Sequence, residues 1–401
     1  MRRVLGCLVA VVLLATGLSG CTAASPVPSS TPTGPTLGNN WQMDHSLALS
    51  YATGFQVDFY PGDGPGCASA SPDALGQCEA GEYALITILD GSRYLVVPPG
   101  RPVPAGLSSG IVVLQQPLTN LYVAASASMS LFAALDELPA VKFTSVAANG
   151  WYIPAVKAAM DSGQVQFGGS YSTPDYELLA QSSPALAIEN TGINSSPDVK
   201  QKLTTLGIPV LVEQSSLETH PLGRNEWIKL IGVLMGKEAL AAQLFEAQVS
   251  RLNAVPGAAT GKTVAYFYVS SKGYVVAPPA GNYVPRMIQL AGASYILSDT
   301  DATADGSSVT LEMEQFYATA QAADYIIYNS TIGAELTSLN DLIALNPLLQ
   351  DFQAVKTGNV WCTDKDFYQD MTGLGQMTTD LHQIVADPAA PDQLTYFHRL
   401  R

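Results

Sequence analysis

An alternation of helical and strand-like segments over residues 128–214 constrains the fold of this 401-residue chain more than any other feature. Amphipathic helical segments separate four strand-like segments that are rich in apolar and β-branched residues, VKFTSV, VQFGG, ALAIEN and PVLVEQ. The same alternation resumes at residue 263 with TVAYFYV, SYIL, DYIIYN and NVWCTD. Strands that alternate with helices form parallel sheets, because each crossover helix packs back onto its sheet. The sequence therefore predicts an α/β fold with two such sheets.

One amphipathic stretch, residues 223–255, separates the two alternating regions. Its apolar residues recur at spacings of three and four, which predicts a single helix roughly 45 Å long. Pro256 and Gly257 end it. We therefore expect two Rossmann-like lobes with mostly parallel sheets, joined by one long rigid helix. The expected parts are an N-terminal α/β lobe at 41–222, the bridging helix at 223–255 and a C-terminal α/β lobe at 256–401.

The first forty residues are typical of an exported lipoprotein. Arg2 and Arg3 precede a short apolar run, and Leu18-Ser19-Gly20-Cys21 follows it. This order predicts a signal peptide at 1–20 and a lipid-modified, palmitate-bearing Cys21, whereas a spanning helix needs about 20 apolar residues. The Ser/Thr/Pro-rich stretch at 21–40 reads as a lipidated flexible linker. We expect the protein to be extracytoplasmic, anchored by lipid to the outer face of a bacterial cell membrane.

Charge and cysteine content narrow the partners. A net charge of −15 without a basic run excludes nucleic acid, and it limits contact with the membrane to the lipid anchor. Cys67 and Cys78 lie eleven residues apart in a Gly/Pro/Ser-rich stretch, where an oxidising compartment favours a disulfide over two free thiols. Cys362 reads as a buried apolar residue. The four histidines are scattered, so no metal site is predicted. The β-rich segment at 41–125 receives no role.

Each expected lobe carries a glutamate in the first turn of an equivalent helix. Thr173 is the expected cap of the first helix, with Glu177 four positions after it and the strand ALAIEN beyond. Thr310 and Glu314 repeat this pattern before the strand DYIIYN. Acidic residues are common in first turns because they suit the helix dipole. Two at matching places also suggest a shared function.

Three patterns suggest enzymes, and each has a simpler explanation. Residues 106–110 (GLSSG) satisfy the hydrolase pattern G-x-S-x-G, but they precede a strand and read as a turn. Residues 257–263 resemble a phosphate-binding loop with the wrong glycine spacing, again ahead of a strand. Glu218, Glu226 and Asp175 could form a glycosidase acid–base pair, yet nothing fixes their separation. We expect no catalytic residues and no enzyme.

Residues 151–245 and 283–385 resemble the solute-binding lipoproteins of ABC importers for iron-siderophore, haem and corrinoid compounds. The resemblance runs through PDYELLAQSSPALAIENTGI, GIPVLVEQSSLETHPLGRNEWIKLIGVLMGKEALA, MIQLAGASYI and MEQFYATAQAADYIIYNSTI. It implies a ligand held between two lobes that a rigid helix bridges. It also implies that Glu177 and Glu314 dock into arginine pockets of a permease dimer, which works with ATPase subunits. We expect a monomer without a cofactor, whose ligand is an iron chelate, haem or a corrinoid.

Open parallel sheets bind ligands at the carboxyl ends of their strands. Aromatic faces and fixed cations at these ends suit large, flat, partly anionic ligands. The residues that follow the expected strands and open the second lobe's first helix give the candidates Trp151, Tyr152, Tyr171, Lys272, Tyr274, Tyr283, Arg286 and Tyr368. We expect no direct metal ligand, because a metal would arrive inside its chelator. A lipid-anchored hydrolase of surface glycans or esters, and a non-transport sensor or adhesion lipoprotein, remain the alternatives.

Overall fold

The computed structural model describes Leu37 and residues 41–62, 81–298 and 308–401. Every described residue belongs to one compact unit, Thr36–Arg401. Within the described residues, no helix is both long enough and apolar enough to cross a membrane.

Several expectations concern other parts of the chain. The signal peptide at 1–20, the lipid-bearing Cys21 and the Cys67–Cys78 disulfide all lie outside the described residues. Cys362 is fully buried with a free thiol, as the sequence predicts.

The described chain begins with a sheet of its own, with strand order β1-β2-β3-β4-β5. Its strands are β1 (His45–Ser46), β2 (Phe55–Tyr60), β3 (Tyr83–Ile88), β4 (Arg93–Val97) and β5 (Ile111–Gln115). Neighbouring strands are antiparallel except for the parallel pair β4 and β5. Val57 and Leu85 belong to two different hydrophobic cores, so both faces of this first sheet are covered. The segment expected to open the N-terminal α/β lobe therefore forms a separate layer.

The second sheet is entirely parallel, with strand order β12-β11-β6-β7-β8. Its strands are β6 (Leu121–Val123), β7 (Val141–Thr144), β8 (Gln166–Phe167), β11 (Ala187–Asn190) and β12 (Val210–Glu213). The helices between them are α2 (Ser128–Ala134), α3 (Pro154–Asp161), α4 (Tyr176–Ser182) and α5 (Pro197–Thr205). The predicted alternation is confirmed here. We call residues 121–217 the N-lobe.

The third sheet is mixed, with strand order β16-β14-β13-β17-β18-β19 and β15 beside β13. Its strands are β13 (Thr263–Val269), β14 (Val275–Ala277), β15 (Ser294–Tyr295), β16 (Val309–Leu311), β17 (Tyr325–Tyr328), β18 (Val360–Thr363) and β19 (Phe397–Arg399). Only β15, β13, β17 and β18 run parallel to one another. We call residues 263–401 the C-lobe.

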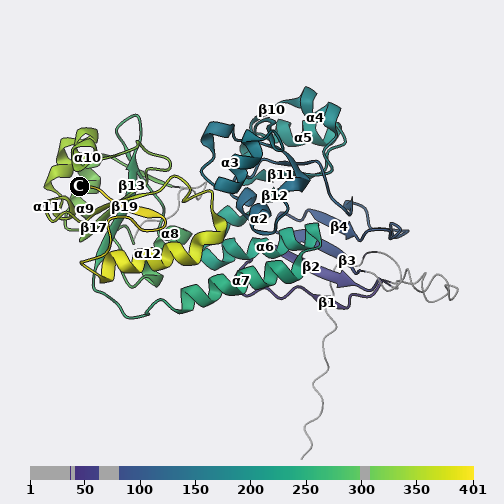
Figure 1. The fold of residues 1–401 in the computed structure, drawn as a ribbon, viewed down its shortest axis with the longest axis horizontal. Helices are drawn as coiled ribbons and strands as arrows, with labels where there is room; N and C mark the ends of the chain where they lie inside the picture. The colour runs from purple at the N-terminus through teal and green to yellow at the C-terminus, as the bar shows by residue number, and fades with distance from the viewer. Residues whose placement is uncertain (1–36, 38–40, 63–80, 299–307) are drawn as a thin grey trace, which may run out of the picture. The chain divides into compact units, whose positions relative to one another are not determined.

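The helices of the C-lobe follow its strands in the predicted alternation. They are α8 (Tyr283–Leu290), α9 (Met313–Ala320), α10 (Leu339–Leu345), α11 (Gln353–Lys356) and α12 (Leu374–Ala386). Figure 1 shows α9, α10 and α11 gathered beside β13 and β17, at the left of the view. The α/β fold class is confirmed, with antiparallel strands added at both edges of the C-lobe sheet.

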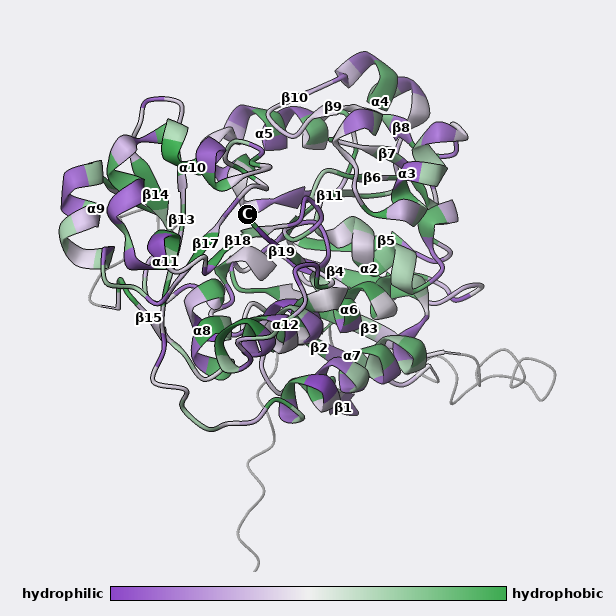
Figure 2. Ribbon diagram, turned by 60° about the vertical axis from the view of Figure 1, so that its left-hand side comes forward, coloured by the Kyte–Doolittle hydropathy of each residue, from purple (hydrophilic) through white to green (hydrophobic). Residues whose placement is uncertain are grey.

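The expected single helix at 223–255 is wrong, because the region forms two helices, α6 (Pro221–Met235) and α7 (Glu238–Asn253). Gly236 ends α6 in the left-handed conformation, with a φ of 68°, which glycine adopts without strain. A Cβ on Gly232 would lie 2.6 Å from the Cβ of Ala241, so glycine also allows the close contact between the two helices. Figure 1 shows α6 and α7 side by side, and Figure 2 shows green and purple residues next to each other along α7.

Two buried carboxylates fasten the first sheet to α6. The fully buried Glu226 accepts hydrogen bonds from the backbone N–H groups of residues 50–52 and from Lys229 Nζ, the last at 2.7 Å. Glu218 accepts hydrogen bonds at 2.9 Å from the two N–H groups of residues 53–54. Charge-assisted bonds of this kind are short and strong. Glu226 stands on α6, and Glu218, three residues before the helix begins, also accepts from Trp227 Nε1 at 3.1 Å, so both hold the chain between β1 and β2 against this helix.

Candidate ligand-binding site

A cavity of about 470 Å³ lies between the N-lobe side of α6 and the C-lobe. Its lining combines four residues from the N-lobe and α6 with eleven from the C-lobe: Thr191, Ser216, Leu217, Arg224, Tyr266, Tyr268, Val276, Ala277, Pro278, Asn282, Tyr283, Ser308, Asn329, Ile332 and Tyr368. Leu217 and Ile332 are both 59% exposed, although they are large apolar side chains from opposite lobes. An apolar rim around a few polar groups is typical of a small-molecule site.

Arg224 is the cation of this cavity. It stands in the first turns of α6, is buried, and its guanidinium carbon lies 4.2 Å above the ring centre of Tyr283. Its Nε has no hydrogen-bond partner among the described residues. A buried arginine with an unused donor favours an acceptor on a bound ligand, such as an anionic group, because a buried donor without a partner is costly.

Sequence reasoning missed Arg224, although the sequence does carry a signal. The residue lies three and seven positions before Trp227 and Ile231, so it continues the apolar stripe of α6. A cation on an apolar stripe is expected to be buried, and a buried cation usually has a partner.

Tyrosines and one asparagine form the opposite wall. The hydroxyl groups of Tyr266 and Tyr368 are 3.0 Å apart, and Asn329 Nδ2 donates to the Tyr368 hydroxyl at 3.1 Å. Burial raises the pKa of both phenols above the ordinary range, so both are neutral hydrogen-bonding groups at physiological pH. The Oδ1 of Asn329 is buried without a partner among the described residues. The wall therefore offers aromatic faces and an unused acceptor.

The structure places two of the eight sequence-predicted ligand residues in this lining, Tyr283 and Tyr368. Trp151 corrects the expectation most clearly, because it is 2% exposed in a hydrophobic core. Its indole Nε1 donates to the backbone oxygen of Val146 at 3.0 Å, which satisfies the polar atom internally. Trp151 therefore packs the N-lobe and does not face the cavity.

The other five candidates lie outside the lining and on the surface. Tyr152 is 46% exposed, and Tyr171 lies with its ring against the backbone of Gly192. Lys272 and Tyr274 are exposed in the turn after β13. Arg286 is exposed on α8 and donates to Gln289 Oε1 at 3.2 Å. The cavity does not bring these five side chains together.

The segment that carries Tyr368 also joins the two lobes. Gln369 Nε2 donates to the backbone oxygen of Gly150 at 2.7 Å, and Gln369 Oε1 accepts from the backbone N–H of Tyr152 at 3.0 Å. Two residues further on, the backbone N–H of Met371 donates to Ser130 Oγ at 3.0 Å. We call residues 368–371 the latch segment. It connects a side chain of the cavity wall directly to the N-lobe.

Glu177 and Glu314 occupy matching places, as the sequence predicts. Each is exposed and is the second residue of its helix, α4 or α9, and each helix leads into a central strand of its sheet. The predicted caps, Thr173 and Thr310, are wrong, since both residues lie in short strands.

The actual caps are acidic. Asp175 caps α4, and its carboxylate accepts a hydrogen bond from the N–H of Leu178 at 3.0 Å. Glu312 stands at the cap of α9 without such a bond. An aspartate one position before a helix caps it at least as well as a threonine two positions earlier, which explains the start of α4. No cap hydrogen bond explains the start of α9.

The two enzyme-like patterns lie directly before strands, as the sequence predicts. Residues 106–110 form turns directly before β5, and residues 257–262 form an irregular segment directly before β13. Neither lies between a strand and a following helix, so neither has the geometry of a nucleophile elbow or a phosphate-binding loop.

Two curated relatives are uncharacterized lipoproteins of Methanocaldococcus jannaschii. One is 27% identical over 321 residues, which cover 77% of this chain and 74% of the relative. The other is 26% identical over 301 residues, covering 71% of this chain and 73% of the relative.

Solved structures with the same fold include two haem-binding proteins. The periplasmic haem-binding protein HutB of Vibrio cholerae has a TM-score of 0.56 at 18% identity, covering 67% of this chain and 99% of its own. The periplasmic haem-binding protein of Pseudomonas aeruginosa has a TM-score of 0.56 at 14% identity, covering 71% and 98%. An ABC transporter substrate-binding protein of Listeria monocytogenes has a TM-score of 0.52 at 14% identity, covering 67% and 99%.

The model of the periplasmic binding protein family matches residues 123–367, which run from the end of β6 to beyond β18 and include the whole cavity lining except Tyr368. The first sheet lies before this match. The chain therefore belongs to the periplasmic binding protein family.

Proposed function

We propose that this protein captures an iron chelate or a related metallo-organic compound, such as haem or a corrinoid, in the cavity between its lobes. The observation that carries the proposal is Arg224, a buried cation with an unused donor, facing a wall of neutral tyrosines. Planar ligands with acidic side groups use both features, since the faces stack on aromatic rings and the acids pair with a guanidinium.

The dimensions of the site support a ligand of this class. A cavity near 470 Å³ lies within the range of small-molecule pockets, about 300–1,000 Å³. The exposed apolar side chains of Leu217 and Ile332 would cover a large ligand that projects beyond the cavity. Two proteins with the same fold are named for haem binding, and this makes haem the first compound to test.

Replacing Arg224 tests the proposal directly. We expect Arg224→Ala to weaken the binding of haemin at least tenfold in calorimetric titration, because the variant leaves the ligand's acidic group unpaired in a buried site. Ferric siderophores and cobinamide complete the panel, and each is titrated against the same variants.

The matched control is Arg286→Ala, which removes an exposed arginine outside the lining. Its affinity should stay within twofold of the natural chain. If no compound of the panel binds the natural chain, the proposed ligand class is wrong. If one binds and Arg224→Ala leaves its affinity unchanged, the site lies elsewhere.

We also propose where the protein lies in the cell. The relatives are named lipoproteins, and Cys21 in its Leu-Ser-Gly-Cys context would carry the lipid that holds this chain at the outer face of the membrane. We expect the chain to partition into the membrane fraction and Cys21→Ser to release it to the soluble fraction. The bound solute would then pass to a permease dimer with its ATPase subunits, with Glu177 and Glu314 as the docking residues. Cys21→Ser protein that stays with the membrane would contradict the anchor.

A further inference from the structure

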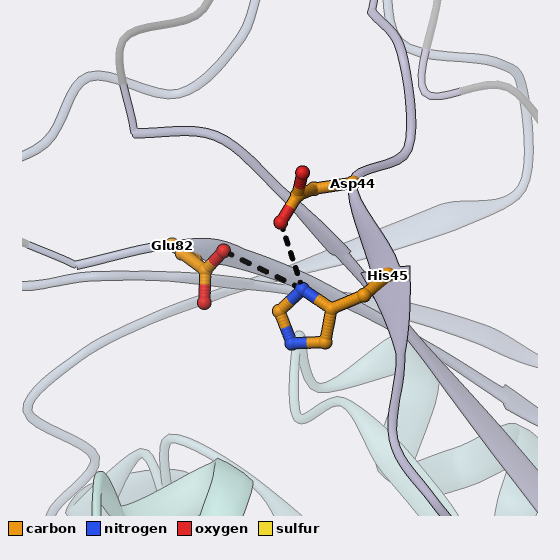
Figure 3. Close-up of side chains that lie close together, drawn as sticks. All are labelled: Asp44, His45 and Glu82. Carbon is orange, nitrogen blue, oxygen red and sulfur yellow. Dashed lines mark hydrogen bonds and ion pairs between the residues drawn. The ribbon is translucent and has the colours of Figure 1, made fainter.

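Three potential metal ligands lie close together on the first sheet. None of them lines the ligand cavity. Asp44, His45 and Glu82 place ligand atoms within 4.8 Å of one another. His45 Nδ1 lies 3.0 Å from Asp44 Oδ2 and 3.8 Å from Glu82 Oε1. Figure 3 shows both carboxylates directed at this one ring nitrogen. Sequence spacing does not predict the group, because Glu82 joins it only through the pairing of β1, β2 and β3.

The backbone holds this group in place. The N–H of Asp44 donates to the oxygen of Phe59 at 2.9 Å, and His45 pairs with Phe59 across β1 and β2. The imidazole also stacks on the Phe59 ring, with ring centres 4.7 Å apart and an interplanar angle of 17°. Glu82 directly precedes β3, the next strand of the same sheet. The ligand groups therefore stand on a shared scaffold instead of on independent loops.

The charge at this position is not balanced by the described residues. Neither Asp44 nor Glu82 forms an ion pair with a lysine or arginine in the described part of the chain. Like charges that stand close together destabilise one another unless a cation joins them.

We propose that Asp44, His45 and Glu82 bind a divalent cation of the zinc class. Two ligand atoms of a tetrahedral zinc ion, at bond lengths near 2.0–2.1 Å, lie about 3.3 Å apart. The distances from His45 Nδ1 to the two carboxylates, 3.0 and 3.8 Å, bracket this value. One imidazole and two carboxylates suit zinc by ligand type, and water would fill the remaining position. All three side chains are exposed, so an ion can reach them from solvent.

Zinc binding to chain purified without a polyhistidine tag tests this site. We expect competition against a colorimetric chelator to show a site whose affinity falls at least tenfold in His45→Ala and in Glu82→Gln. Zinc should also raise the melting temperature of the natural chain and not that of His45→Ala, because binding to the folded state alone is stabilising.

The matched control is His398→Ala, which removes another histidine paired with an aspartate, Asp364, at 2.6 Å. This variant should bind zinc as the natural chain does. Equal zinc affinity in His45→Ala and the natural chain would overturn the proposal and assign any bound zinc to other residues. Loss of binding in His398→Ala instead would overturn it as well. Circular dichroism of each variant confirms that the fold is kept.

Discussion

The carboxyl group of Glu189 lies in the N-lobe core, on β11, with neither oxygen hydrogen-bonded among the described residues. Burial raises its pKa to about 8. In the unfolded chain the same group has a pKa of about 4.3. The folded state therefore keeps the proton between these two values while the unfolded state loses it. Glu189 costs stability progressively as the pH rises from about 4.3 to about 8, by a few kcal/mol in total.

Glu189→Gln should remove this pH dependence, because glutamine has nearly the same shape and no proton to lose. We expect the free energy of unfolding, measured with urea, to fall less between pH 5 and 8 in the variant than in the natural chain. At pH 8 the variant should be the more stable of the two. Glu177→Gln, which changes an exposed glutamate of the same lobe, should keep the natural slope. Parallel curves for Glu189→Gln and the natural chain would show that Glu189 titrates at an ordinary pH.

At the scale of elements, local sequence patterns predicted most strands and helices. They failed where contacts between distant residues determine where a helix ends. The strands ALAIEN and DYIIYN appear as β11 and β17, because buried parallel strands carry continuous apolar runs. The prediction of one helix at 223–255 was wrong because a glycine such as Gly236 can stand inside a helix or end one. The contact between α6 and α7 determines that Gly236 ends a helix here.

Local patterns likewise predicted some residues of the candidate site and missed others. Tyr283 and Tyr368 could be found from strand ends and helix starts, because the fold fixes where such residues gather. The place of Arg224 on the apolar stripe of α6 indicates burial, but that it faces a cavity depends on how the lobes pack around α6. Glu218 and Glu226 show how the first sheet is held against α6, by backbone N–H groups some 165 residues away or more. No short pattern in the sequence encodes such a pairing.

At the scale of the whole molecule, the segment that forms part of the cavity wall also contacts both lobes. The latch segment supplies Tyr368 to the cavity, while Gln369 and Met371 bond the N-lobe. A ligand that displaced Tyr368 would also disturb these bonds, and this would link occupancy of the cavity to the relation of the lobes. The exposed helix starts that carry Glu177 and Glu314 belong one to each lobe. A permease that contacts both would therefore sense the relation between them.

The docking role proposed for these two glutamates can be tested separately from ligand binding. We expect the double variant Glu177→Ala, Glu314→Ala to abolish solute uptake by cells that depend on this protein, because it removes the only proposed charged contact from each lobe. Ligand affinity of the purified double variant should stay within twofold, since neither glutamate lines the cavity. Each single variant should retain partial uptake, because one lobe still docks.

Glu246→Ala is the matched control, since Glu246 is exposed on α7 and has no counterpart in the other lobe. It should leave uptake unchanged, which separates docking from a general effect of surface charge on so acidic a protein. Full uptake by the double variant with ligand binding intact would refute docking through these residues. It would leave the solute-binding site untouched, because Arg224 and the glutamates are tested by independent measurements, affinity for the first and uptake for the second.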